Sequence, residues 1–254
     1  MTESDVGRQP GRMPDRRKNY ALLVDGYVKD LFATGMVLQR LDYEVYIANS
    51  GEDALKIISA ALPELVITEL SLQQMSGLEL LVHLKHDTAT RDIPVIVHTA
   101  VGDPKREEHC RASGCAAFLK KPVELDDLFC AIQAATEATP RRFIRLRTLL
   151  PVRVGGQTSS ETVDSVEFVS ELSENGMFVR TMTPRPVNAV VPVTLIIQSM
   201  AVKVKAVVAR KSELSPGLFK EPGMGMRFVE ISETSRELLR NFIKGQIMKE
   251  ITTA

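Results

Sequence analysis

Short apolar runs and helically patterned segments alternate over the first half of the chain. The runs of strand length are Tyr20–Val24, Glu44–Ala48, Leu65–Thr68, Pro94–His98 and Ala116–Leu119. Segments whose apolar residues recur at helical spacing lie between or after them, for example Val28–Leu41, Ala54–Leu62, Leu78–His86 and Leu125–Ala135. This alternation predicts a doubly wound α/β domain with a five-stranded parallel sheet, whose functional crevice lies at the carboxyl ends of the strands.

The second half has a different pattern, with short runs rich in Val and Ile and no long helix between them. The runs are Leu149–Val154, Val163–Val169, Met177–Arg180, Val190–Ile197, Val202–Ala209 and Gly225–Ile231. Most are separated by turn-forming pairs such as Gly155-Gly156, Asn175-Gly176 and Pro216-Gly217. The pattern predicts a six-stranded antiparallel β-barrel.

Residues 232–250 close the chain with apolar positions at helical spacing, and Ser232 is well placed to be the N-cap. We expect this terminal helix to pack on the barrel. A dimer or partner surface is the alternative for its apolar face.

The charges divide the chain at about the same place as the pattern. Residues 1–139 carry 15 Lys+Arg and 21 Asp+Glu, a balance of −6, whereas residues 140–254 carry 17 and 11, a balance of +6. An acidic half joined to a basic half indicates two domains with different partners. We expect the domains at residues 19–138 and 139–254, behind a disordered leader at residues 1–18.

Several classes of protein are disfavoured by the composition. No apolar run reaches the roughly 18 residues of a membrane span, and no signal peptide opens the chain. Cys110, Cys115 and Cys130 lack metal-ligand spacing. We therefore expect a cytoplasmic protein with reduced thiols, without a metal site or cofactor. No helix-turn-helix pattern appears, so DNA is not an expected partner.

Polar residues follow the carboxyl ends of the predicted parallel strands. The set is Asp25, Gly26, Glu69, Thr99, Phe118 and Lys121. Together with the segment PELVITELSLQQMSGLELL, these positions resemble the receiver domain of bacterial two-component response regulators over about residues 18–138. The resemblance implies that the position of Glu69 accepts a phosphoryl group with the help of Mg²⁺, and that Thr99, Phe118 and Lys121 respond to it.

The chain departs from the receiver pattern at its acidic residues. Gly26 stands where the family has a second acid for Mg²⁺, and Glu69 stands where it has the phosphoacceptor Asp. The side chain of Glu is one methylene longer, which moves the attacking oxygen by about one bond length in a reaction that depends on positioning. We therefore expect that the Mg²⁺ site is lost and that this domain is a pseudo-receiver.

Three roles stay open for Glu69. It could still be phosphorylated, or it could pair with Lys121 and only balance charge. It could also mimic the phosphorylated state, with its carboxylate reaching toward Thr99 and Lys121.

Two motifs in the second half carry another resemblance. RRFIR at 141–145 precedes the first barrel strand, and ELSENG at 171–176 lies on the barrel. With GMGMRFVEIS at 223–232 they resemble the PilZ domain, a bacterial receptor for cyclic di-GMP, over about residues 140–250. The resemblance implies a ligand site made by Arg141, Arg142, Arg145, Glu171, Ser173 and Gly176. Arginine suits this ligand because its planar guanidinium can chelate phosphate or a guanine edge and can stack on a ring.

The two resemblances predict a non-enzymatic bacterial signalling adaptor. Cyclic di-GMP would order the arginine linker and change how the pseudo-receiver meets a protein partner, in a motility, pilus, exopolysaccharide or biofilm system by family analogy. A homodimer through the receiver or the terminal helix is a further expected contact. Because Glu171 replaces the family's Asp or Asn, two alternatives stay open: a scaffold that has lost nucleotide binding, and a phosphorelay response regulator.

Overall fold

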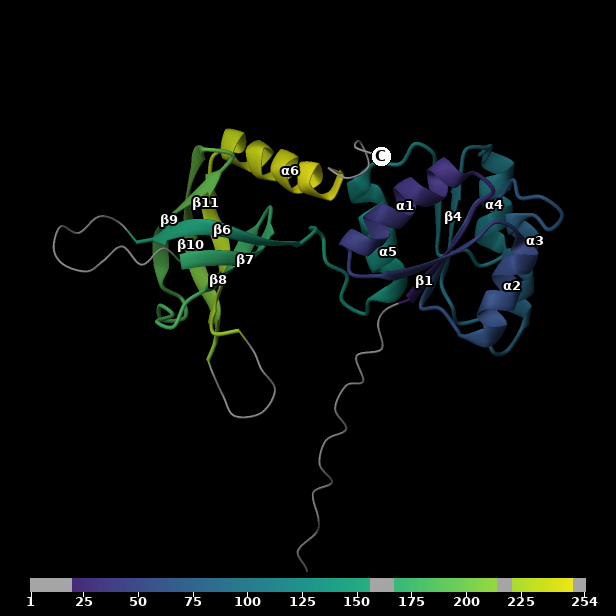
Figure 1. Cartoon of the computed structure of the whole chain (residues 1–254), viewed down its shortest axis with the longest axis horizontal. Coiled ribbons are helices and arrows are strands. Elements are labelled where there is room, and N and C mark those ends of the chain that lie inside the picture. The colour runs from purple at the N-terminus through teal and green to yellow at the C-terminus, as the bar shows by residue number, and fades with distance from the viewer. Residues whose placement is uncertain (1–19, 156–166, 214–220, 249–254) are drawn as a thin grey trace, which may run out of the picture.

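The computed structural model describes residues 20–155, 167–213 and 221–248. The predicted leader and the Pro216-Gly217 turn lie outside these residues. Figure 1 shows an α/β domain beside a β-barrel, with the last helix lying along the barrel and pointing toward the first helix of the α/β domain. No helix in the described ranges is both long and apolar enough to cross a bilayer.

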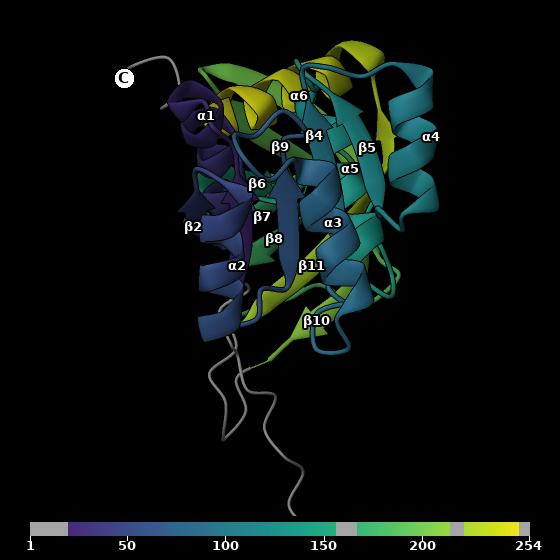
Figure 2. The ribbon, with the colours of Figure 1, turned by 90° about the vertical axis from the view of Figure 1, so that its right-hand side faces the viewer.

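Five parallel strands form the sheet of the α/β domain, in the order β2-β1-β3-β4-β5. They are β1 (Tyr20–Val24), β2 (Glu44–Ala48), β3 (Leu65–Thr68), β4 (Val95–Thr99) and β5 (Ala117–Lys120). The helices that alternate with them are α1 (Val28–Arg40), α2 (Gly51–Ala60), α3 (Gly77–His86), α4 (Pro104–Ala112) and α5 (Leu125–Thr136). Helices α1 and α5 cover the face turned to the barrel, and α2, α3 and α4 cover the other (Figures 1 and 2). Because both faces are covered, β3 and β4 contain only buried residues. The doubly wound α/β prediction is confirmed.

Helix α4 does not follow from hydrophobic periodicity. Only Cys110 is buried among its residues, so the segment has no apolar stripe. Local signals at its start specify it instead. The Asp103 side chain accepts a hydrogen bond from the Arg106 amide at 2.9 Å, and Pro104 occupies the first turn.

The second half closes into a barrel of order β10-β11-β8-β7-β6-β9, in which every neighbouring pair is antiparallel. Its strands are β6 (Leu146–Val154), β7 (Glu167–Ser173), β8 (Gly176–Arg180), β9 (Val190–Ile197), β10 (Met200–Ser212) and β11 (Gly223–Ile231). The six-stranded barrel is therefore confirmed. Within the described residues β7 ends at Ser173, four residues beyond the predicted end, because the first residues of the ELSENG motif continue the ladder with β8.

The terminal helix α6 (Glu233–Met248) packs its apolar face on the barrel, and its buried residues are Leu239, Phe242, Ile243 and Ile247. The Ser232 hydroxyl accepts a hydrogen bond from the Ser235 amide at 3.2 Å, which confirms the predicted N-cap.

The two domains share an apolar core and are joined by polar contacts. One cluster of buried residues runs from the α1 and α5 side of the sheet through Ile144 of the linker into the barrel. Arg147 of β6 pairs with Asp42 at 3.2 Å, and Lys244 of α6 pairs with Asp126 of α5 at 2.7 Å. The Arg141 amide also donates to the Gln133 side chain at 3.2 Å, so the linker is attached to α5.

Two adjacent isoleucines of β9 allow a matched test of the barrel core. Ile197 is 0% exposed and Ile196 is 39% exposed. We expect Ile197→Ala to lower the free energy of unfolding by about 2–5 kcal/mol, because it leaves a cavity inside the barrel. Ile196→Ala removes the same atoms from the surface and should cost less than about 1 kcal/mol. Denaturant unfolding of both variants measures this, and equal losses would contradict the assigned register of β9.

Candidate functional site

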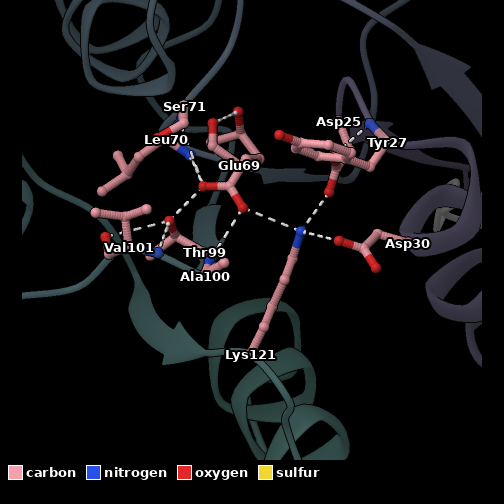
Figure 3. A network of polar contacts seen from close by, with 11 residues as sticks. Asp25, Tyr27, Asp30, Glu69, Leu70, Ser71, Thr99, Ala100, Val101 and Lys121 are labelled. Atoms are coloured by element: carbon pink, nitrogen blue, oxygen red, sulfur yellow. Dashed lines mark hydrogen bonds and ion pairs between the residues drawn. The ribbon is translucent and has the colours of Figure 1, made fainter.

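The ammonium of Lys121 lies among three carboxylates at the carboxyl ends of the parallel strands (Figure 3). Its Nζ is 2.5 Å from Asp25 Oδ2, 2.7 Å from Asp30 Oδ2 and 3.0 Å from Glu69 Oε2. Asp25 directly follows β1, Glu69 follows β3 and Lys121 follows β5. Burial by itself lowers the pKa of Lys121, but hydrogen bonds to the three carboxylates outweigh it and raise that pKa above its ordinary value. The lysine is therefore a fixed positive charge.

The Glu69 carboxylate receives hydrogen bonds on both oxygens (Figure 3). Oε1 accepts from the Leu70 amide at 2.6 Å, from the Ser71 amide at 3.2 Å and from the Thr99 hydroxyl. Oε2 accepts from the Ala100 amide at 3.1 Å and faces Lys121. A carboxylate offers about four lone-pair sites, so these five donors saturate it.

Saturation sets the chemistry of Glu69. Burial raises the pKa of this carboxyl group. The hydrogen bonds from Thr99, Lys121, Ser71 and Ala100 lower the pKa by more than burial raises it, so the pKa lies below its ordinary value. The group is thus held ionised, with only 3% of its side chain exposed. An ionised carboxylate without a free, accessible lone pair can balance charge and hold its donors in place, but it is poorly arranged to attack an incoming phosphorus atom.

The structure brings together four of the six residues predicted for this crevice, namely Asp25, Glu69, Thr99 and Lys121. Gly26 makes no side-chain contact, and a Cβ built on it would meet nothing within 4 Å. Phe118 is buried in the apolar cluster under α2, α3 and α4, and it takes no part in the polar network.

Asp30 is the residue of this network that sequence reasoning missed. It lies in the first turn of α1, one helical turn before the buried Thr34. Residues four apart share a helix face, so Asp30 lies on the same side of α1 as the buried Thr34. The contact with Lys121 then places it at the strand ends.

The receiver resemblance implies Mg²⁺, and the donor set does not fit it. Gly26 supplies no oxygen ligand, while Asp25, Asp30 and Glu69 all face the Lys121 ammonium. No cluster of three or more His, Cys, Asp or Glu side chains in the described ranges is arranged to hold a metal ion. The lysine stands at the point where the carboxylates converge.

The barrel carries a cleft of about 430 Å³ beside the linker. All six residues predicted for the nucleotide site line it, namely Arg141, Arg142, Arg145, Glu171, Ser173 and Gly176. The linker supplies the three arginines, and the β7–β8 hairpin supplies the other three residues. Residues about 25 positions apart in sequence thus face one another across one cavity.

Contacts within the cleft show how these residues are held. Arg145 pairs with Glu171 at 3.6 Å, and both side chains are about half exposed. The Ser173 hydroxyl donates to the Gly176 carbonyl at 3.1 Å, which closes the hairpin. Position 176 must be a glycine because β11 passes close to it. A Cβ on residue 176 would overlap the carbonyl oxygen of Met226.

The cleft also contains residues that the motifs do not include, chiefly Arg210 and Arg227 on the neighbouring strands and the ring of Phe178. Arg210 and Arg227 lie 34 and 51 positions beyond Gly176, and the strand order of the barrel brings them to the linker. Arg210 belongs to none of the quoted segments, so only the fold assigns it to this cavity.

The linker arginines line two further cavities between the domains. Arg142 also borders a cavity of about 330 Å³ against α5 and α6. Arg141 and Arg145 border one of about 240 Å³ against α5 and the end of α1. The linker is therefore a wall shared by the barrel cleft and the domain interface.

Comparison with known families matches both halves of the chain. Residues 21–133 match the model of the response regulator receiver domain, and residues 139–245 match that of the PilZ domain. The polar-differentiation response regulator DivK of Brucella ovis is 35% identical over 89 residues, which cover 35% of this chain and 72% of the relative. DivK of Brucella anthropi is 34% identical over the same length and coverage.

Two solved structures to which this chain is similar are also receiver domains. The response regulator receiver domain protein of Clostridium thermocellum is 28% identical, with a TM-score of 0.43, and the match covers 46% of this chain and 93% of that one. The signal receiver domain of an HD domain-containing protein from Pseudomonas fluorescens is 27% identical, with a TM-score of 0.45, and covers 48% and 96%.

The lowered pKa of Glu69 predicts a pH-dependent contribution to stability. In the unfolded chain the carboxyl group titrates near its ordinary value of 4.5, and in the folded protein it titrates lower. Its stabilisation is therefore present above pH 4.5 and is lost as the pH falls through the folded-state pKa. We expect Glu69→Gln to lower the free energy of unfolding by about 1–3 kcal/mol at pH 7, and we expect this difference to shrink toward pH 3.

Denaturant unfolding at several pH values measures the difference. Glu108→Gln is the matched control, because it removes an exposed carboxylate from α4. A difference between wild type and Glu69→Gln that stays constant from pH 7 to pH 3 would contradict the assigned network.

Proposed function

The chain belongs to the response-regulator family and joins a receiver domain to a PilZ domain, and on this basis we propose that it is a non-enzymatic signalling adaptor whose barrel cleft binds cyclic di-GMP. One observation carries the proposal. The three linker arginines and the three residues of the second motif surround a single cleft, whose volume of about 430 Å³ lies in the range of small-molecule sites.

The charges of the cleft support a phosphate-bearing ligand. The Arg141 guanidinium forms no ion pair within the described ranges, and its neighbour Arg142 contacts only the Phe143 ring, at 5.5 Å. Among the residues that the structure describes, Arg145 has only the long ion pair with Glu171, at 3.6 Å. Three guanidinium groups with little compensation beside one cavity suit a ligand with two phosphates, because each can bind a phosphate bidentately.

For the receiver domain we propose the pseudo-receiver role in which Glu69 mimics a phosphorylated residue. Its carboxylate holds the Thr99 hydroxyl and the Lys121 ammonium. These are the side chains that respond to the phosphoryl group in the receiver resemblance. The longer side chain of Glu allows its oxygens to lie beyond the strand end, where a phosphoryl group on Asp would place its own. The domain then stays in one state, and its output is contact with a protein partner.

Titration calorimetry with cyclic di-GMP tests the receptor proposal. We expect saturable binding at micromolar ligand, and we expect Arg141→Ala and Arg145→Ala each to weaken it at least tenfold because a charge-assisted contact is lost. Arg153→Ala removes an exposed arginine of β6 outside the cleft and should bind as the wild type does. Absence of binding heat in the wild type would refute the receptor role.

Incubation with acetyl phosphate and Mg²⁺, followed by intact-mass measurement, tests the pseudo-receiver proposal. We expect no phosphorylated species, because the lone pairs of Glu69 are occupied and the donor set does not fit Mg²⁺. The double variant Gly26→Asp with Glu69→Asp restores both acids at positions with room for them, and it should gain a phosphoryl group. A stoichiometric adduct on the wild type that disappears in Glu69→Gln would overturn the proposal.

A further inference from the structure

Four positions on neighbouring strands align across one wall of the barrel cleft. The register pairs Arg210 of β10 with Gly225 of β11, Gly225 with Phe178 of β8, and Phe178 with Glu171 of β7. Directly paired residues on adjacent strands project to the same face of a sheet. All four line the cleft, so they form a continuous strip along it.

Gly225 leaves room for the Arg210 side chain to lie across β11. A Cβ at this position would lie 2.8 Å from Arg210 Cγ and 2.9 Å from Nε. Because Gly225 has no side chain, the Arg210 side chain crosses β11 and places its guanidinium carbon 5.7 Å from the centre of the Phe178 ring. The strip thus ends in a guanidinium over an aromatic ring, in a cavity open to solvent.

The charge of Arg210 is not used by the fold. Arg210 is exposed and forms no ion pair or hydrogen bond in the part of the chain that the structure describes. A cation–π contact at an exposed site contributes little to folding. The Arg210 guanidinium has no charged partner among the described residues, and it occupies space that only a glycine at position 225 leaves open. A role in binding a ligand explains this arrangement better than a contribution to folding stability does.

We propose that Arg210 and Phe178 form a stacking platform for one guanine base of the ligand, with Glu171 at the edge of that base. This inference rests on the proposed cyclic di-GMP function, and the two residues that it adds to the site, Arg210 and Phe178, lie outside the two motifs. A planar guanidinium and an aromatic ring both stack on a purine face, and neither distinguishes one purine from another.

Glu171 supplies the discrimination. Its carboxylate lies next to Phe178 on the strip and accepts hydrogen bonds only. The Watson–Crick edge of guanine presents two adjacent N–H donors, which suit such an acceptor. Adenine presents a ring nitrogen acceptor at the matching position, which a carboxylate repels. The platform supplies affinity, and Glu171 supplies preference for guanine.

Calorimetry of the full chain with cyclic di-GMP and cyclic di-AMP tests the platform. Arg210→Ala should weaken cyclic di-GMP binding roughly tenfold to a hundredfold, as expected for the loss of one stacked base. Arg210→Lys should lose most of the same affinity, because an ammonium keeps the charge but cannot stack as a plane. Gly225→Ala should resemble Arg210→Ala, since the added methyl displaces the Arg210 side chain.

Lys203→Ala is the control, because it removes one exposed positive charge from the same strand outside the cleft. It should bind within twofold of the wild type. Glu171→Gln should narrow the preference for cyclic di-GMP over cyclic di-AMP while Arg210→Ala leaves that ratio unchanged. Thermal unfolding of each variant checks the fold, and Phe178→Leu replaces Arg210→Ala if the latter does not fold.

The outcomes separate this inference from the proposed function. Wild-type affinity in Arg210→Ala and Phe178→Leu, with losses in Arg141→Ala, would overturn the platform and leave the receptor intact. Equal affinity of Arg210→Lys and wild type would also overturn it, because charge alone would then be sufficient. If the wild type binds no cyclic di-GMP, the receptor role fails and the platform fails with it.

Discussion

The position of the Lys121 ammonium is the constraint on which the α/β domain depends. It gathers Asp25 of the β1 end, Asp30 of α1 and Glu69 of the β3 end around one partly buried cation. Three carboxylates this close would repel one another without it, and removing one member of such a group leaves the others uncompensated. Helix α5 begins four residues after Lys121 and carries Asp126 and Gln133, which contact the barrel side. The contacts of Lys121 therefore also position the start of α5, the helix that contacts the linker and α6 of the second domain.

The linker arginines connect the cleft to that interface. Arg141 and Arg145 border both the barrel cleft and the cavity against α1 and α5, while the backbone of Arg141 is bound to α5. A ligand that draws these side chains into the cleft must change the walls of the interface cavities. Coupling of this kind needs no separate signalling element, because the groups proposed to bind the ligand are the same groups that line the contact between domains.

The sequence was sufficient for the two folds, and most residues of the crevice network and of the barrel cleft were named from it before their neighbours in space were known. The strand patterns predicted the sheet and the barrel. A strand buried on one face shows alternating apolar residues, and a strand buried on both faces shows a continuous apolar run. Helix α4 shows no apolar pattern, because Cys110 is its only buried residue. Its capping residues were the only sequence signal for it. Asp30 and Arg210 were missed for a different reason. Their roles depend on which elements are neighbours in space, and neither belongs to a motif with fixed spacing.

Glu69 and Glu171 show how one extra methylene acts in opposite ways. Glu69 is buried, and the added length lets its carboxylate reach the amides of Leu70 and Ser71 as well as Thr99 and Lys121, so every lone pair is used. Glu171 is half exposed, and its added length brings it only to a 3.6 Å contact with Arg145. The exposed Arg145–Glu171 ion pair is weak, so little free energy is lost when either residue binds another partner. Breaking the contacts of the buried Glu69 carboxylate would leave its charge uncompensated, which costs far more free energy. In the function proposed for the chain, the same change of residue type holds the first domain in one state and leaves the second able to respond.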